Sequence, residues 1–426
     1  MSNSYRASLD YLYSLQLFGI KLGLENIRQL LARLDNPQRK LRIIHVAGTN
    51  GKGSTAAALA NIFQAAEIPA GLYTSPHLHS FTERIRVATR QISEAEVVAL
   101  IDELRPHAEE LRTTFFEFTT ALALLHFQRC GVEWVILETG LGGRLDATNA
   151  VEPELCLLTP VALDHTAYLG NTLAEVAAEK AGIFKPKVPV LSACQLPEVE
   201  LVLRRRAEEL AAPLLLAGRD YRWQAEAEQL AFSGLGVELK RLTPGLAGIH
   251  QQQNMALALA AAAFLRRNML EIPLQALQQG VEQVRWPGRL EWLPEQILLD
   301  GAHNVAGAKV LAEYLRQQGV EKLHLIVGIK ADKQGELLLQ ELLPLVGCLY
   351  ATRPPVDVAV APEKLVQQAQ KSGILAAEYV DPRAALNAAL HQRRAGETLL
   401  VAGSLFLVAA VRELLLTETQ LLSITA

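Results

Sequence analysis

Short apolar runs alternate with longer segments of helical character along much of the chain. Apolar runs bounded by turn residues predict buried strands, and the alanine- and leucine-rich segments between them predict helices. Alternation of this kind is typical of a mainly parallel sheet with helices on both faces. The strands predicted in the first part of the chain are 42–47, 70–73, 134–137 and 155–159, and the helices are 54–66, 118–129 and 254–266.

The alternation is interrupted twice. Residues 214–242 have a looser pattern, and 223–240 within them predicts paired short strands that leave the main sheet. A turn-rich break follows at Trp286-Pro287-Gly288-Arg289, and the alternation then restarts. The later predictions are strands at 296–299, 323–328 and 399–402 and a helix at 305–318. We therefore expect two α/β domains, 1–288 and 297–426, joined by a hinge at 289–296.

Length and composition agree with this division. A chain of 426 residues is longer than one ordinary hydrophobic core organises. Half of the residues are hydrophobic (50%) and a fifth are charged (20%), which is typical of a globular protein. The formal net charge of -4 argues against a nucleic-acid-binding surface, and we expect no nucleic-acid partner.

The four cysteines form no C-x-x-C pair, which argues against a structural zinc site or a disulfide framework. Cys156 and Cys194 lie in apolar stretches, and we expect both to be buried. The N-terminal residues lack the pattern of a signal peptide, and the longest uncharged stretch, 399–411, is too short to span a bilayer. These features predict a cytoplasmic enzyme with no membrane partner.

The strongest local motif lies at His45-Val46-Ala47-Gly48-Thr49-Asn50-Gly51-Lys52-Gly53-Ser54-Thr55. A predicted strand enters a glycine-rich turn from which a predicted helix starts, so backbone N–H groups and the helix N-terminus would face a phosphate. The strict pattern G-x-x-x-x-G-K-[ST] is not met, because Val46 stands at the first glycine position and Gly53 follows Lys52. A glycine-rich turn with a surface lysine is the alternative.

Other polar side chains follow predicted strands. Glu138 ends the strand at 134–137, and Asp164-His165 comes after the strand at 155–159. Acids at strand ends beside a phosphate loop are candidate magnesium ligands, although solvated strand ends have the same pattern. Lys180 lies in a mostly apolar helical segment, where the residues alone favour a lysine that reaches solvent from an amphipathic helix.

Taken together, the motifs resemble those of the Mur-ligase superfamily, and specifically of folylpolyglutamate synthase and dihydrofolate synthase. The matching segments follow the family order along nearly the whole chain. They are 47–55 (A-G-T-N-G-K-G-S-T), 73–78 (Y-T-S-P-H-L), 82–86 (T-E-R-I-R), 138–149 (E-T-G-L-G-G-R-L-D-A-T-N), 163–166 (L-D-H-T), 179–185 (E-K-A-G-I-F-K), 287–291 (P-G-R-L-E), 299–304 (L-D-G-A-H-N), 332–334 (D-K-Q) and 402–405 (A-G-S-L). The stretch Lys21–Glu25 also looks similar to the family.

The resemblance implies a P-loop ATPase-like domain with a mainly parallel sheet, which binds ATP and folate, and a smaller Rossmann-like C-terminal domain for glutamate ligation. It also implies roles for single residues. Ser75 and Glu138 would ligate one Mg²⁺, and His165 a second together with Lys180 as a carbamate. A potassium ion is a further implied cofactor. The ATP-binding residues would be Thr49, Asn50, Gly51, Lys52, Gly53, Ser54, Asn254, Arg289 and Asp300.

The same resemblance implies a catalytic set of Lys52, Lys180, His165 and His303, with His303 and Ser404 on the glutamate side. The expected reaction transfers the γ-phosphoryl group of ATP to a carboxylate, and glutamate then attacks the acyl phosphate. Water must be excluded because an acyl phosphate hydrolyses readily, and closure about the hinge would exclude it. The implied small-molecule partners are dihydropteroate, folates and L-glutamate, and the family suggests a monomer.

The motifs do not decide which carboxylate substrate is used, dihydropteroate or a folate. The residues implied at a pterin site are Thr114, Phe115, Phe116, Glu117, Leu145, Asp146 and Ala147. Phe115 and Phe116 are also typical of core aromatics that enter the following helix. We expect activity on both dihydropteroate and folates, with a monofunctional folylpolyglutamate synthase as the alternative.

The chain departs from the family pattern in places. Val305 replaces the usual proline after Asn304, Pro160 replaces the usual serine or asparagine before L-D-H, and 201–242 has no matching motif. A muramyl-peptide ligase is a less favoured reading, because only about forty residues precede the phosphate loop. A P-loop switch without ligase activity is disfavoured by the motifs at 299–304 and 402–405.

Overall fold

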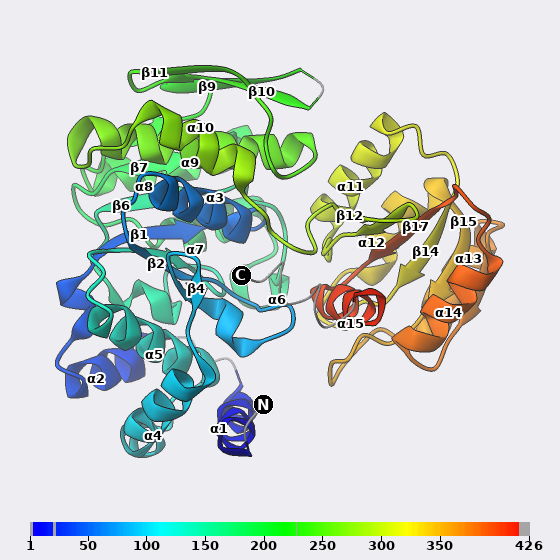
Figure 1. Ribbon diagram of the computed structural model, residues 1–426, viewed down its shortest axis with the longest axis horizontal. Coiled ribbons are helices and arrows are strands. Elements are labelled where there is room, and N and C mark those ends of the chain that lie inside the picture. Colours follow the sequence, from blue (N-terminus) through cyan, green and yellow to red (C-terminus); the bar gives the residue numbers. More distant parts are fainter. Residues whose placement is uncertain (1–2, 20–22, 227, 417–426) are drawn as a thin grey trace.

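Two sheets organise the protein, which is described here by a computed structural model over residues 3–19, 23–226 and 228–416. The larger sheet is built before residue 217 and the smaller one after residue 290, and they lie side by side in Figure 1. Lys21 and Leu22 of the family-like N-terminal stretch lie outside the described residues. Within the described residues, no helix has both the length and the apolar character that crossing a bilayer requires.

The larger sheet has the strand order β4-β3-β2-β5-β1-β6-β7-β8. Its strands from β2 to β8 run parallel, and β3 and β4 add an antiparallel edge. The parallel strands are mostly apolar because helices cover both faces. The strands are β1 Arg42–Ala47, β2 Ala70–Tyr73, β3 Ile85–Val87, β4 Arg90–Gln91, β5 Trp134–Glu138, β6 Leu155–Leu158, β7 Val190–Ser192 and β8 Leu214–Leu216.

Alternate residues of β1 divide the core between the two faces. Ile44 and Val46 pack under α3 (Lys52–Ala65), α9 (Ile249–Asn268) and α10 (Leu274–Gln283). Ile43 and Ala47 face the helices on the other side, as strand alternation requires. Those helices are α1 Asn3–Ser14, α2 Glu25–Arg33, α4 Glu94–Leu111, α5 Phe115–Arg129, α7 Leu173–Ala181 and α8 Pro197–Glu209.

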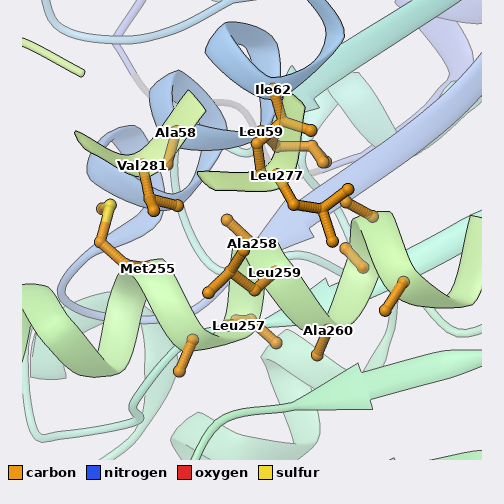
Figure 2. Packing of buried hydrophobic residues seen from close by; sticks show 14 of the residues in the cluster. Ala58, Leu59, Ile62, Met255, Leu257, Ala258, Leu259, Ala260, Leu277 and Val281 are labelled. Carbon is orange, nitrogen blue, oxygen red and sulfur yellow. The ribbon is translucent and has the colours of Figure 1, made fainter. Parts of the chain in front are cut away.

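Helix α9 is enclosed by its neighbours. Its alanine-rich middle is buried against Leu59 and Ile62 of α3 and Leu277 of α10 (Figure 2). A separate antiparallel sheet, β9 Tyr221–Glu226, β10 Gln229–Gly234 and β11 Val237–Leu242, packs over α9 and α10 (Figure 1). The paired short strands predicted at 223–240 are therefore confirmed, with a third strand in the set.

The smaller sheet has the order β12-β13-β17-β14-β15-β16 and is parallel except for β12. Helices α11 Val305–Gln317, α12 Gly335–Leu342 and α13 Pro362–Lys371 pack on one face, and α14 Pro382–Gln392 and α15 Leu405–Leu415 on the other. Its strands are β12 Glu291–Leu293, β13 Ile297–Leu299, β14 Leu323–Val327, β15 Val346–Ala351, β16 Leu375–Glu378 and β17 Thr398–Ala402.

The predicted class, a mixed α/β fold with a mainly parallel sheet and a second α/β unit, is confirmed. The prediction for Cys194 is wrong, because its side chain is exposed. β7 ends at Ser192, and the chain leaves the sheet before it reaches Cys194. Cys156, inside β6, is buried as predicted.

Candidate active site

The turn between β1 and α3 has a backbone that only glycine accommodates at two positions. Gly48 has φ 144°, and a Cβ atom there would overlap the side chain of Thr159. Gly51 has φ 88°, and a Cβ there would overlap Asn254 of α9. Thr49 ties the turn to the loop after β6, because its Oγ1 donates to Ala162 O at 2.9 Å and accepts from Ala162 N at 3.0 Å. The turn is therefore preformed at the N-terminus of α3, where an anion is favoured.

A cavity of about 430 Å³ lies between the two sheets, within the size range of small-molecule sites. Each residue expected at ATP or at a metal lines it. His303 lines the cavity from the side of the smaller sheet. His250 and Gln251 also line it, and neither was assigned from the sequence. The expected residues brought together here are Thr49, Asn50, Gly51, Lys52, Gly53, Ser54, Ser75, Glu138, His165, Lys180, Asn254, Arg289, Asp300 and His303.

Glu138, at the end of β5, is a buried carboxylate on the cavity wall. Its Oε2 accepts from Ser75 N at 3.0 Å. Burial raises the pKa of Glu138, and the charges of Lys52 and Arg289 only partly offset that rise. In the described part of the chain no three His, Cys, Asp or Glu side chains are grouped to hold a metal. Ser75 and Glu138 therefore fit one Mg²⁺ only if phosphate oxygens complete its ligands.

Lys180 is buried in α7, which overturns the expectation of a solvent-reaching side chain. Its Nζ donates to Gly48 O at 2.7 Å, directly beneath the phosphate loop. Burial, followed by the charge of Lys52, lowers the pKa of Lys180 to about 7. An amine with this pKa is substantially uncharged near neutrality, which makes it nucleophilic.

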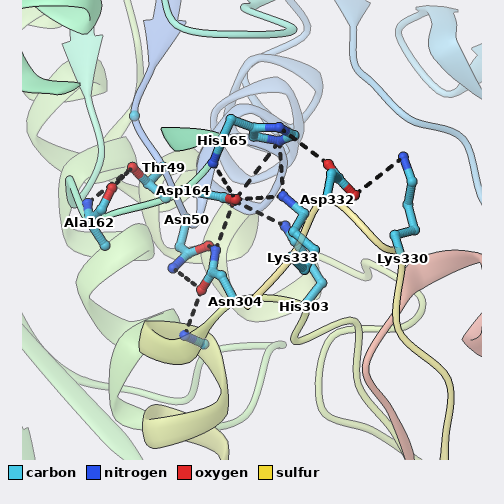
Figure 3. Close-up of polar contacts among 12 residues, drawn as sticks. Thr49, Asn50, Ala162, Asp164, His165, His303, Asn304, Lys330, Asp332 and Lys333 are labelled. Carbon is cyan, nitrogen blue, oxygen red and sulfur yellow. Dashed lines mark hydrogen bonds and ion pairs between the residues drawn. The ribbon is translucent and has the colours of Figure 1, made fainter. Parts of the chain in front are cut away.

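A cluster of charged side chains closes the far side of the cavity (Figure 3). Asp164, in the loop after β6, forms an ion pair with Lys333 of the smaller sheet's side at 2.5 Å, and both side chains are buried. His303 Nε2 lies 3.5 Å from Asp164 Oδ2. Burial raises the pKa of Asp164. The hydrogen bond from His303 and the charge of Lys333 outweigh burial and hold the pKa of Asp164 well below its ordinary value. The pair thus links the two halves of the molecule.

His165 belongs to the same cluster. Its Nε2 lies 3.0 Å from Lys333 Nζ and its Nδ1 3.5 Å from Asp332 Oδ2. Burial lowers the pKa of His165 to about 4, so the neutral ring accepts from Lys333. A second Mg²⁺ at His165 and Lys180 does not fit this arrangement, because both ring nitrogens of His165 are engaged, Nε2 with the Lys333 ammonium and Nδ1 with Asp332.

Asn304 joins the phosphate loop to α11. It caps that helix, since its Oδ1 accepts from Gly307 N at 2.8 Å, and its side-chain amide pairs with that of Asn50 at 3.0 and 3.2 Å. Val305 begins α11 without the usual proline, as expected for a position that proline favours but does not require. Ser404 is buried and caps α15 by accepting from Phe406 N at 3.2 Å. Its neighbour Leu405, rather than Ser404, lines the cavity.

A second cavity of about 390 Å³ adjoins the first, because Ser75, Pro76, Gly140 and Leu141 line both. All the side chains expected at a pterin site lie around it, together with Arg84, which sequence reasoning did not assign. These residues are Thr114, Phe115, Phe116, Glu117, Leu145, Asp146 and Ala147.

The aromatic wall of this second cavity is set by a helix cap. Thr114 Oγ1 accepts from Glu117 N at 3.3 Å, and Glu117 Oε2 accepts from Thr114 N at 2.7 Å, which is a capping box at the start of α5. Phe115 is stacked on Tyr13 with centroids 5.9 Å apart, and the Arg84 guanidinium lies 5.2 Å from its ring centroid. Phe115 and Phe116 therefore begin the helix and also face the cavity.

Arg412 of α15 makes a further contact between the two halves. It is fully buried, its Nε donates to Glu291 at 3.0 Å, and its Nη1 lies 2.9 Å from His79 Nε2. His79 belongs to the loop that follows β2 and carries Ser75. Neither Arg412 nor His79 stood out in the sequence, because the contact joins residues far apart in the chain.

Known proteins match this chain over nearly its whole length. Residues 46–262 match the Mur ligase middle domain and 288–405 the Mur ligase glutamate ligase domain. A dihydrofolate synthase/folylpolyglutamate synthase of Bacillus subtilis is 36% identical, covering 97% of this chain and 99% of its own. Escherichia coli FolC in complex with DHPP and ADP is 32% identical with a TM-score of 0.88, covering 96% of this chain and 97% of its own.

A bifunctional folylpolyglutamate synthase/dihydrofolate synthase solved with Mn, AMPPNP and L-glutamate is 31% identical with a TM-score of 0.86. It covers 96% of this chain and 98% of its own. Identity and coverage of this extent, together with the two domain matches, are those of family members. The chain belongs to the Mur ligase family, in the branch of the dihydrofolate synthases and folylpolyglutamate synthases.

Proposed function

We propose that this protein is an ATP-dependent ligase that adds L-glutamate to dihydropteroate and to the γ-carboxylate of folates through an acyl phosphate. The observation that carries the proposal is the junction of two cavities. The phosphate loop lines the larger cavity, the aromatic wall lines the smaller one, and Ser75 and Glu138 lie at or near their junction. Relatives named for both activities, and solved relatives with ADP or with L-glutamate, support it.

In this proposal the chain's own groups stabilise phosphoryl transfer by charge and position. Lys52 and Arg289 line the larger cavity and would neutralise charge on the transferring group. The N–H groups of Thr49 and Asn50 donate to Pro160 O, so the N–H groups in the first turn of α3, from Lys52 to Ser54, would hold the phosphates. A Mg²⁺ ion held by Ser75 and Glu138 would supply Lewis-acid polarisation of the phosphate oxygens.

Glutamate would enter from the side of the smaller sheet, where His303 faces the larger cavity. We assign ATP and folate binding to residues 1–288, the hinge to 289–296 and glutamate ligation to 297–426. β12 lies within the assigned hinge and pairs with β13, so bending would occur at the ends of β12. Closure would exclude water from the acyl phosphate.

The lowered pKa of the Lys180 amine supports carbamylation, which would place an anionic oxygen beside Lys52. A second metal at that carbamate and His165 would require Lys333 to leave His165. We further propose that a potassium ion assists, and that the protein is a cytoplasmic monomer without nucleic-acid or membrane partners. Sedimentation of the purified protein measures the oligomeric state.

The test is incorporation of labelled glutamate with ATP and Mg²⁺, run in parallel on dihydropteroate and tetrahydrofolate. Product from both supports the bifunctional assignment. Product from tetrahydrofolate alone would leave a monofunctional folylpolyglutamate synthase. No product from either, with nucleotide binding intact, would refute the ligase assignment.

A further inference from the structure

The central strand β1 carries a fully buried histidine. His45 shares its sheet face with Ile43 and Ala47, both of which are packed in apolar clusters. Its Nδ1 has no hydrogen-bond partner, while its Nε2 lies 2.9 Å from Thr148 Oγ1. A buried nitrogen without a hydrogen-bond partner lowers the stability of the folded protein, and an apolar side chain at this position would avoid that loss. The contact at Nε2 is therefore the feature that distinguishes a histidine at this position.

The hydrogen-bond donors in this contact can be assigned. Thr148 Oγ1 lies 2.5 Å from Asp146 Oδ1, and an ionised carboxylate only accepts. The single hydroxyl proton of Thr148 is therefore directed at Asp146, and the hydroxyl oxygen accepts from His45 Nε2–H. This assignment leaves Nδ1 without a proton, as an acceptor that meets no donor. Burial lowers the pKa of His45 to about 3, so the ring stays neutral.

The chain of hydrogen bonds ends at the smaller cavity. Asp146 is buried, lines that cavity, and also accepts from Thr148 N at 3.0 Å and Leu141 N at 2.7 Å. Its carboxylate is thus held in one orientation. The other cavity-lining acid, Glu117, is engaged in the capping box with Thr114. Asp146 Oδ1 accepts twice from Thr148, whereas Oδ2 accepts from Leu141 N and keeps a lone pair for a donor on a ligand.

A pterin matches this wall chemically. Its faces suit the aromatic side chains, and its N3–H and 2-amino group form an adjacent pair of donors that one carboxylate accepts. In dihydropteroate the reacting carboxylate is attached directly to the aminobenzoyl group, so the pterin must lie near the reaction centre. In a folate a glutamyl residue intervenes, and the pterin lies farther out.

We propose that His45 and Thr148 are positioning residues that hold the Asp146 carboxylate toward the pterin edge and thereby determine the use of dihydropteroate. The inference rests on the proposed bifunctional activity. Neither residue touches the substrate, and both act through Asp146. We expect turnover of tetrahydrofolate to depend less on this orientation, since the intervening glutamyl residue moves its pterin away from the reaction centre.

The test uses paired variants of the full-length enzyme. Thr148→Val removes the hydroxyl at similar shape and Thr148→Ser keeps it, while His45→Leu removes the donor and His45→Gln keeps one. We expect Thr148→Val and His45→Leu to raise the KM for dihydropteroate about tenfold or more, with kcat changed only a few-fold. The KM for tetrahydrofolate stays within about twofold, and Thr148→Ser and His45→Gln recover most of the loss.

The matched control is Thr352→Val, which removes a buried hydroxyl without a partner, in the smaller sheet's unit. We expect Thr352→Val to leave KM and kcat unchanged for both substrates. Equal losses on both substrates in Thr148→Val, or no rescue by Thr148→Ser, would overturn the positioning role and leave the ligase function standing. A wild-type enzyme inactive on dihydropteroate would overturn the inference and the bifunctional assignment together.

Discussion

The ion pair between Asp164 and Lys333 predicts a measurable stability difference. Lys333→Met keeps an extended apolar side chain but leaves Asp164 without its cation in a site where both side chains are nearly closed to solvent. Removing one partner of a buried pair costs about 3–5 kcal/mol, and the contacts from His303 and Asn304 favour the lower end. We expect a loss of about 3 kcal/mol in the free energy of unfolding.

The pH dependence has a definite sign. The pKa of Asp164 is below its ordinary value in the folded protein, so the folded chain binds this proton more weakly than the unfolded chain. The stability from the pair is complete above the unfolded pKa, about 4, and is lost as the pH falls below it. The difference between wild type and Lys333→Met should therefore begin to shrink as the pH falls below about 4 and continue to shrink toward the lower pKa of the folded protein.

The assay is a double-mutant cycle with Lys333→Met, Asp164→Asn and the double variant, followed by urea unfolding. Because two units are present, the loss appears in whichever transition includes their separation. We expect a coupling energy of at least about 1.5 kcal/mol. Single losses below about 0.5 kcal/mol, or losses that simply add in the double variant, would refute a buried pair between the two halves.

Three further predictions concern the phosphate loop and its neighbours. Lys52→Ala should lower kcat at least about a hundredfold in an ADP-release assay while the melting temperature is kept, and full turnover would contradict the mechanism. Gly48→Ala should lower the melting temperature and ATP affinity together, because a Cβ overlaps Thr159, and retention of both would contradict the loop geometry. Enzyme freed of carbon dioxide should regain activity with bicarbonate, more readily above about pH 7 where the Lys180 amine is uncharged, whereas bicarbonate-independent activity would contradict carbamylation.

Local patterns predicted the elements of the sheets well. The runs at 42–47 and 70–73 coincide with β1 and β2 because continuous apolar residues have few alternatives in a parallel sheet. The start of α5 was placed three residues late, at Phe118 instead of Phe115. The capping box at Thr114 and Glu117 was the available signal, and it was interpreted only as a substrate segment.

Contacts between distant segments could not be predicted in the same way. The residues around Lys180 in the sequence are mostly apolar and do not indicate its contact. Only the tertiary fold places its amine beside Gly48 O. Lys333 was part of a recognised motif, yet its pairing with Asp164 depends on how the two sheets face each other. Long-range geometry of this kind has no periodicity from which it could be inferred.

The small sheet β9–β11 has a consequence for solubility rather than for chemistry. None of its residues lines the cavities described above, yet it packs over the outer side of α9 and α10. A chain shortened by these three strands would keep every side chain assigned to ATP, metal and substrate. It would also uncover a contiguous apolar helical surface, and such surfaces drive self-association. We therefore expect this sheet, which lies outside both cavities, to keep the enzyme dispersed.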